Sequence, residues 1–82
     1  MWLVYTTLDD SAQAHKLAKR LVEDGLAACV QVSGPVTSYY RWDGHLNCTE
    51  EVVLTMKCSA GQWSRLKYQF EHMHPYDTPE LI

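Results

Sequence analysis

Hydrophobic and polar residues follow two periods along the chain, one of two residues, typical of strands, and one of about 3.6 residues, typical of helices. The first segments of the chain predict a strand and then a helix. Residues 2–7 form a β-branched and aromatic run, which predicts a first strand that is mostly buried. Asp10 can cap a following helix with Gln13 three residues on, and Gly25 stands where a left-handed residue ends one. Between them lies one apolar stripe with helical spacing, made of Ala14, Leu17, Ala18, Leu21 and Val22.

After this helix the period of two returns and predicts a long antiparallel hairpin. Residues 28–32 alternate as a strand with two unlike faces should, and residues 52–58 do the same farther along the chain. The Asp-Gly pair at residues 43–44 is a strong signal for a two-residue hairpin turn. A Gly-Pro pair at residues 34–35 interrupts the first strand of the hairpin. Because proline cannot donate to the ladder, we expect a bulge or an edge position there.

A second amphipathic helix and the beginning of another strand complete the pattern. Residues 59–62 have the form of a capping box, and the apolar stripe that follows consists of Trp63, Leu66, Phe70 and Met73. Pro75 is expected to stop this helix after His74. The last two residues, Leu81 and Ile82, have the character of the start of a strand.

The order of these elements, β-α-β-β-α-(β), predicts the fold class. Each helix can return the chain by a right-handed crossover, which gives an antiparallel sheet with both helices on one face. We therefore expect a single α+β domain over residues 1–82, a ferredoxin-like sandwich whose last strand is truncated. A chain of 82 residues buries only a modest core, so association with a partner chain would add buried area.

Composition and charge narrow the range of partners. The formal net charge is −3, and the seven Lys and Arg residues are scattered, so no basic stripe indicates nucleic acid as a partner. No apolar run approaches the roughly 20 residues that span a bilayer, and the N-terminus lacks the features of a secretory signal. Cys29, Cys48 and Cys58 lie far apart without a C-x-x-C pair, which favours reduced thiols. We expect a cytoplasmic protein that binds neither nucleic acid nor membrane.

The sequence offers little support for catalysis. It contains no local Ser-His-Asp or Cys-His signature and no Gly-rich phosphate loop. Glu50 and Glu51 are adjacent on a predicted strand, so they face opposite ways and do not form an acid/base pair. Unless folding brings distant residues together into a catalytic group, the prediction is a protein that is not an enzyme.

Three segments carry motifs that are specific when they are read together. Residues 26–30 read Leu-Ala-Ala-Cys-Val, and residues 38–44 read Ser-Tyr-Tyr-Arg-Trp-Asp-Gly. Residues 74–81 read His-Pro-Tyr-Asp-Thr-Pro-Glu-Leu. In this order, the segments resemble the Leu-Ala-Ala-Cys signature, the Tyr-x-Trp-acidic-Gly hairpin tip and the His-Pro-Tyr-x-x-Pro-Glu run of the CutA (divalent-cation tolerance) family. The resemblance covers essentially the whole chain, which is similar to a C-terminally short member because the family normally continues past Ile82.

The resemblance implies a function and an assembly. Members of the CutA family associate as homotrimers through the long hairpins and the C-terminal region, and they are linked to divalent-cation tolerance. The resemblance implies no obligatory cofactor. It implies that the ligand is Cu(II) or another divalent cation. An alternative is a non-catalytic trimeric signalling or scaffold module that binds a small anionic ligand between subunits. An RNA-binding module shares the sheet topology, but the chain lacks the aromatic RNP pattern and a basic face.

Candidate metal ligands follow from the resemblance. His74 and Glu80 match positions that the family associates with copper or other divalent ions, and imidazole and carboxylate suit such ions. His72 could add a ligand, since it stands close to His74 where the helix breaks. Cys29, in the first motif, could bind a soft metal. The alternatives are structural, because a His before Pro often bonds the last helix carbonyls, and a small strand residue beside alanines often packs.

A second group of candidates concerns a cleft or interface between subunits. Tyr40, Trp42 and Lys57 could line such a cleft, with Lys57 attracting an anionic ligand. Tyr76 of the third motif is assigned to the same region. The alternative is that tyrosine and tryptophan on a hairpin serve cross-strand and interface packing.

Overall fold

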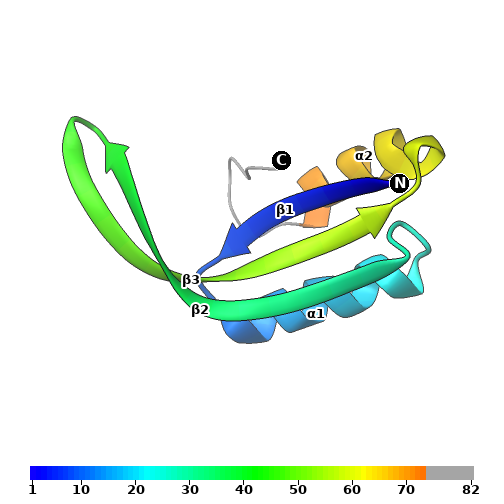
Figure 1. The fold of residues 1–82 in the computed structure, drawn as a ribbon, viewed down its shortest axis with the longest axis horizontal. Coiled ribbons are helices and arrows are strands. Elements are labelled where there is room, and N and C mark those ends of the chain that lie inside the picture. The colour runs from blue at the N-terminus through cyan, green and yellow to red at the C-terminus, as the bar shows by residue number, and fades with distance from the viewer. Residues whose placement is uncertain (74–82) are drawn as a thin grey trace.

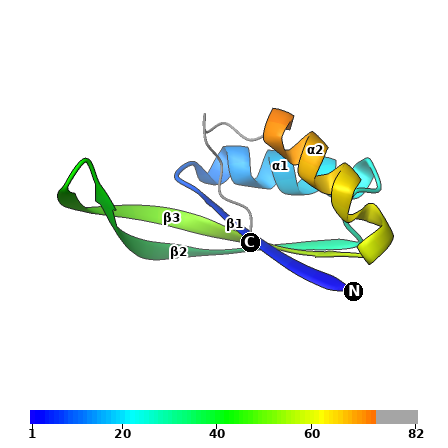
Figure 2. The same cartoon turned by 90° about the horizontal axis from the view of Figure 1, so that it is seen from above.

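The computed structural model describes residues 1–73 as a sheet with one layer of helices (Figure 1). In chain order, the elements are β1 (Trp2–Leu8), α1 (Ser11–Glu23), β2 (Cys29–Trp42), β3 (His45–Cys58), a 3₁₀ turn η1 (Ala60–Gln62) and α2 (Trp63–Met73). The strands pair antiparallel in the order β1-β3-β2. Both helices lie on one face of this sheet, and no described element covers the other face (Figure 2). The predicted α+β plan is confirmed, while the strand expected at residues 81–82 lies outside the described residues.

The first strand has one buried face instead of the mostly buried run that its composition suggests. Val4, Thr6 and Leu8 are buried towards the helices. Leu3 and Tyr5, in contrast, are 49% and 42% exposed. The expectation of a mostly buried strand was therefore wrong, because an antiparallel sheet with helices on one face leaves alternate side chains open.

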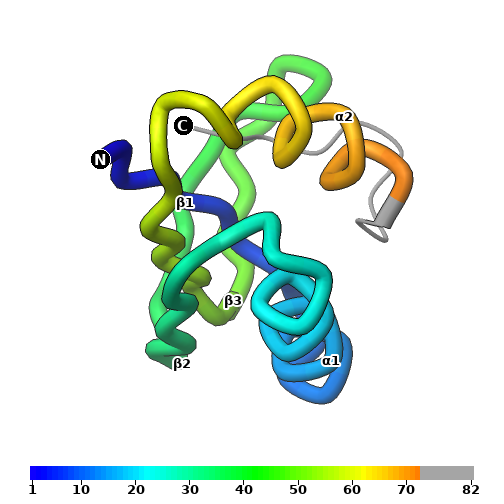
Figure 3. The backbone as a smooth tube through the Cα atoms, turned by 90° about the vertical axis from the view of Figure 1, so that its right-hand side faces the viewer, coloured from blue at the N-terminus to red at the C-terminus, as the bar shows by residue number. Residues whose placement is uncertain are grey.

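The core lies between the helices and the inner face of the sheet. Figure 3 views the sheet from its end and shows α1 and α2 on the same side of the strands. The fully buried side chains include Leu54 and Met56 of β3, Leu21 of α1, and Leu66 and Phe70 of α2. The stripe that was predicted for α1 is confirmed except for its last member, Val22, which is 44% exposed.

Both ends of α1 follow the capping pattern predicted from the sequence, and the start of α2 does not. The Oδ1 atom of Asp10 accepts a hydrogen bond of 3.0 Å from the backbone N–H of Gln13, as a helix N-cap does. Gly25 has φ +70 after the end of α1, as predicted. The capping box predicted at residues 59–62 is wrong: the Ser59 side chain makes no capping hydrogen bond. The chain instead closes a 3₁₀ turn, with Gln62 N–H bonded to the Ser59 carbonyl at 3.1 Å, and α2 begins only at Trp63.

The hairpin of β2 and β3 extends well beyond the helices (Figure 1). Its turn residues Asp43 and Gly44 have φ 52 and 77, which confirms the predicted two-residue turn with both central residues left-handed. The β2–β3 register shifts between Ser33 and Val36, and β2 lies at the edge of the sheet that residues 1–73 form, so the interruption at residues 34–35 has both predicted features. We call residues 36–51, beyond this bulge, the arm.

Candidate functional site

The open face of the sheet brings Cys29 and Lys57 next to each other. They are direct partners in the β2–β3 ladder, and Lys57 also pairs with Leu3 of β1. Met56 and Cys58 are buried under the helices, so Lys57 between them points to the open face. Both Cys29 and Lys57 are exposed. Within residues 1–73, the predicted site residues that lie side by side are Cys29 with Lys57, and Tyr40 with Trp42 on the arm.

The arm carries the two predicted aromatic residues on the same face as Lys57. Tyr40 pairs with Asn47 and Trp42 with His45, and both partners lie an even number of residues from Lys57 along β3. The Tyr40 hydroxyl shares a hydrogen bond of 2.8 Å with Thr49 Oγ1, which anchors that ring across the hairpin. Trp42 is 72% exposed.

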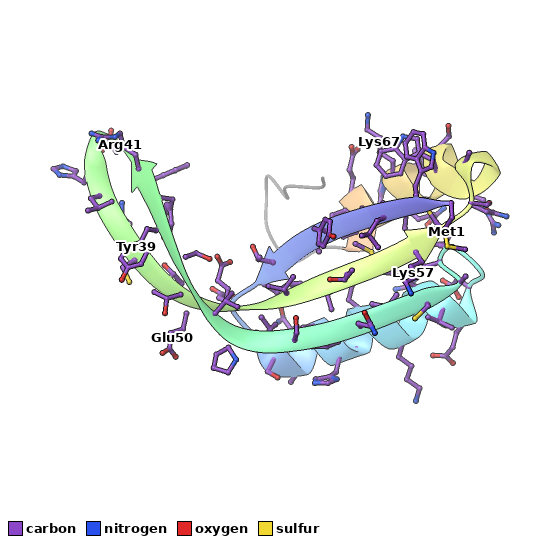
Figure 4. All side chains as sticks on the ribbon, in the orientation of Figure 1. Met1, Tyr39, Arg41, Glu50, Lys57 and Lys67 are labelled. Atoms are coloured by element: carbon purple, nitrogen blue, oxygen red, sulfur yellow. The ribbon has the colours of Figure 1, made fainter. Side chains whose placement is uncertain are left out.

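The predicted cleft residues do not meet within one chain. Lys57 lies ten residues from Asn47, the partner of Tyr40, along β3. A strand advances by roughly 3.3 Å per residue, so about 33 Å of strand lies between Lys57 and Asn47. Figure 4 shows Lys57 near one end of the hairpin and Arg41, the neighbour of Tyr40, near the other. A cleft lined by Tyr40, Trp42 and Lys57 therefore requires more than one copy of the chain.

The other face of the arm is also apolar. Tyr39 is 71% exposed and Leu46 is 75% exposed, and both lie on the face that is turned towards the helices farther along the sheet. Arg41, which pairs with Leu46, shares this face. Large apolar groups thus lie open on both sides of the same two-stranded segment. Sequence reasoning missed Tyr39 and Leu46, because alternation along a strand shows which residues share a face and not whether that face is covered.

Among the predicted metal ligands, the structure describes His72 and Cys29. His72 is exposed near the end of α2, where its Nδ1 atom bonds to the backbone carbonyl of Tyr68 at 2.8 Å and its ring lies 4.7 Å from the Tyr68 ring. The Cys29 side chain lies on the sheet face opposite the helices, whereas His72 is in α2, so Cys29 and His72 lie in different layers. Residues 1–73 contain no group of three or more His, Cys, Asp and Glu arranged to hold a metal ion. His74, Tyr76 and Glu80 lie outside the described residues.

Tyr68, which contacts His72, was not among the predicted site residues. The signal was present, because residues four apart on a helix lie on the same face and Tyr68 precedes His72 by four. The apolar stripe of this helix predicts which side is buried and does not indicate which exposed side chains contact one another.

The three cysteines have different surroundings. Cys29 and Cys48 are exposed and Cys58 is buried, and none of them forms a disulfide. Burial raises the pKa of the Cys58 thiol above its usual range, and the nearby N-terminal ammonium group partly offsets this change. Cys58 is therefore a core thiol, because its protonated form is favoured and its side chain packs under the helices.

These features define a class of protein: a small α+β domain with helices on one sheet face and a two-stranded apolar arm that projects from it. No helix within residues 1–73 is long and apolar enough to cross a membrane. Residues 2–82 match the family model described as CutA1 divalent ion tolerance protein. The chain belongs to this family.

Individual relatives agree with the family model. The divalent-cation tolerance protein CutA of Thermus thermophilus is 36% identical over 80 residues, which cover 98% of this chain and 78% of that protein. A crystal structure of CutA1 from Pyrococcus horikoshii superposes with a TM-score of 0.95 at 34% identity and covers all of this chain and 79% of that one. CutA1 from Shewanella superposes with a TM-score of 0.91 at 39% identity, covering 98% of this chain and 75% of that one. The relatives from Thermus thermophilus and Pyrococcus horikoshii are named divalent-cation tolerance proteins, and neither name is that of an enzyme.

Proposed function

We propose that this chain is a non-catalytic, cytoplasmic protein of the divalent-cation response that assembles as a homotrimer and binds copper or another divalent cation. The observation that carries the proposal is the family match over residues 2–82, together with the fold that the relatives share. Function resides in sites and not in folds, so the assembly and the ion each need their own argument and their own test.

Self-association is supported by the exposed apolar surface. The open sheet face carries Leu3 and Tyr5, and the arm carries Tyr39, Trp42 and Leu46, all exposed in the single chain. A small domain that leaves so many large apolar groups in water gains stability when they are covered by another copy. The arm suits this role because it projects away from its own helices (Figure 2).

Cation binding is supported by the chemistry of the available donors. Imidazole and carboxylate groups suit Cu(II) and Zn(II), and the proposed ligands are His72, His74 and Glu80. Cys29 could contribute a thiolate from the open sheet face, which favours softer ions such as Cu(I). Since Cys29 and His72 lie in different layers of one chain, they would belong to different sites unless a second copy brings them together.

The assembly is tested by light scattering behind a sizing column. We expect a solution mass of three chains, and a mass of one or two chains would contradict the trimer. Calorimetric titration with Cu(II) and Zn(II) tests cation binding in the same preparation. An absence of heat with both ions would count against direct metal handling, whatever the oligomeric state.

A second candidate, an anion-binding module, is favoured by one observation. Lys57 shares a strand face with Tyr40 and Trp42 but lies at the opposite end of the hairpin, so a joint cleft could form only between copies. We expect inorganic phosphate, used as the probe, to raise the melting temperature of the wild type and not of Lys57→Ala. Lys67→Ala, which removes a cation on α2, is the matched control and should keep the shift. An unchanged melting temperature of the wild type would leave this candidate without support.

A further inference from the structure

Tyr68 holds the imidazole of His72 from two directions. The Nδ1 atom lies 2.8 Å from the Tyr68 carbonyl oxygen, and the two ring centroids are 4.7 Å apart with their planes inclined by 39°. Because a carbonyl oxygen can only accept a hydrogen bond, Nδ1 must carry the proton. The lone pair of the neutral ring is then on Nε2, and the side chain is exposed.

This arrangement is the one that orients a metal-binding histidine. In protein metal sites, the ring nitrogen that does not bind the ion usually donates its proton to a carbonyl or carboxylate, which fixes the tautomer and the ring orientation. A free imidazole side chain in water favours the opposite tautomer, with the proton on Nε2. The Tyr68 carbonyl therefore selects the less common tautomer, in which the lone pair on Nε2 is available to bind a metal ion.

We propose that Tyr68 pre-orients His72 as an Nε2-directed ligand for a borderline divalent cation of the Cu(II), Ni(II) and Zn(II) class. The proposal rests on the proposed cation-binding function, and it adds one nitrogen donor and the residue that positions it. Neutral imidazole is a common ligand for these ions. One imidazole supplies one ligand, so water or other side chains complete the coordination.

The competing role for His72 is purely structural. A histidine in the last turn of a helix can bond a terminal carbonyl and interact favourably with the helix dipole without binding any ion. The variant His72→Asn separates the two roles, since the asparagine amide places a donor close to the position of Nδ1 but has nothing in the position of Nε2. A structural role survives this change, and a ligand role does not.

The tautomer is tested first, in the metal-free 82-residue chain labelled with ¹⁵N. Long-range ¹H–¹⁵N correlation spectra, recorded above the pH range in which imidazole titrates, should show His72 protonated on Nδ1. His15, exposed on α1, is the internal control: residues 1–73 provide it with no hydrogen-bond partner, so Nε2–H should predominate. Protonation of His72 on Nε2 would overturn the proposal whatever the protein binds.

Binding is then measured by calorimetric titration with Cu(II) and with Zn(II) alone. His72→Asn should weaken affinity by about tenfold or more while the urea midpoint stays unchanged, since loss of a ligand or of its positioning partner typically has effects of this size. Tyr68→Ala, which removes the ring and keeps the carbonyl, should have a smaller effect, and His15→Asn should have none. Wild-type binding that survives His72→Asn would overturn this inference and leave the proposed function standing. A wild type that binds neither ion would overturn both.

Discussion

The core half of the β2–β3 hairpin and the arm are made from the same two strands and have opposite surroundings. Leu54 and Leu46 are both in β3 and lie on the same face of the hairpin, yet the first is 0% exposed and the second 75%. The difference arises because the helices cover the core half of the hairpin and stop short of the arm (Figure 1). One strand can thus serve the core of its own chain at one end and present an apolar surface at the other.

The largest expected effect comes from truncating the same residue type in the two regions. Leu54→Ala should lower the free energy of unfolding by about 3 kcal/mol, since it removes a fully buried side chain and leaves a cavity. Leu46→Ala should leave the stability of the dissociated chain nearly unchanged and shift the self-association measured by sizing. Urea unfolding at several protein concentrations separates the two effects, because association makes stability concentration-dependent. Equal losses for both variants in the dissociated chain would break the comparison.

The bulge that divides the two regions should be the next most sensitive position. Gly34 has φ +140, and a Cβ there would lie 3.1 Å from the Val52 Cα and 3.2 Å from the Glu51 carbonyl oxygen. Gly34→Ala is therefore expected to cost about 1–3 kcal/mol of stability through backbone strain. Gly61→Ala is the matched control, because a Cβ at Gly61 meets nothing within 4 Å. Thermal unfolding of both variants is the measurement, and a Gly34→Ala protein as stable as the control would show that the bulge tolerates a side chain.

The smallest effect concerns two thiols of β3, one in each region. Burial raises the pKa of Cys58 in the folded state, so above the ordinary thiol pKa the unfolded chain loses this proton first. The contribution of Cys58 to the free energy of unfolding is therefore complete below the ordinary thiol pKa and is lost as the pH rises through the raised pKa of the folded state. Cys58→Ala should flatten the alkaline decline in urea-unfolding stability, whereas Cys48→Ala, on the exposed arm, should leave it as in the wild type. Parallel pH profiles for Cys58→Ala and the wild type would contradict the assignment.

Much of the fold could be predicted from neighbouring residues, and the candidate site much less. The cap at Asp10, the end of α1 at Gly25 and the turn at residues 43–44 were predicted because each depends on contacts within a few residues. Residues 59–62 have the sequence of a capping box, but they form a 3₁₀ turn in which the Ser59 side chain makes no capping hydrogen bond. His72 was a predicted ligand, yet its tautomer became visible only through the Tyr68 carbonyl.

The sequence by itself determined the order of the elements, the two faces of each strand and the family to which the chain is similar. Periodicity and turn chemistry act over a few residues, so they can be read along the chain. Only the tertiary structure decided that the helices stop short of the arm, that one face of β1 stays open, and that Lys57 lies far from Tyr40 and Trp42. These properties depend on which distant elements pack together and how far each one reaches, and a pattern along one strand contains neither quantity.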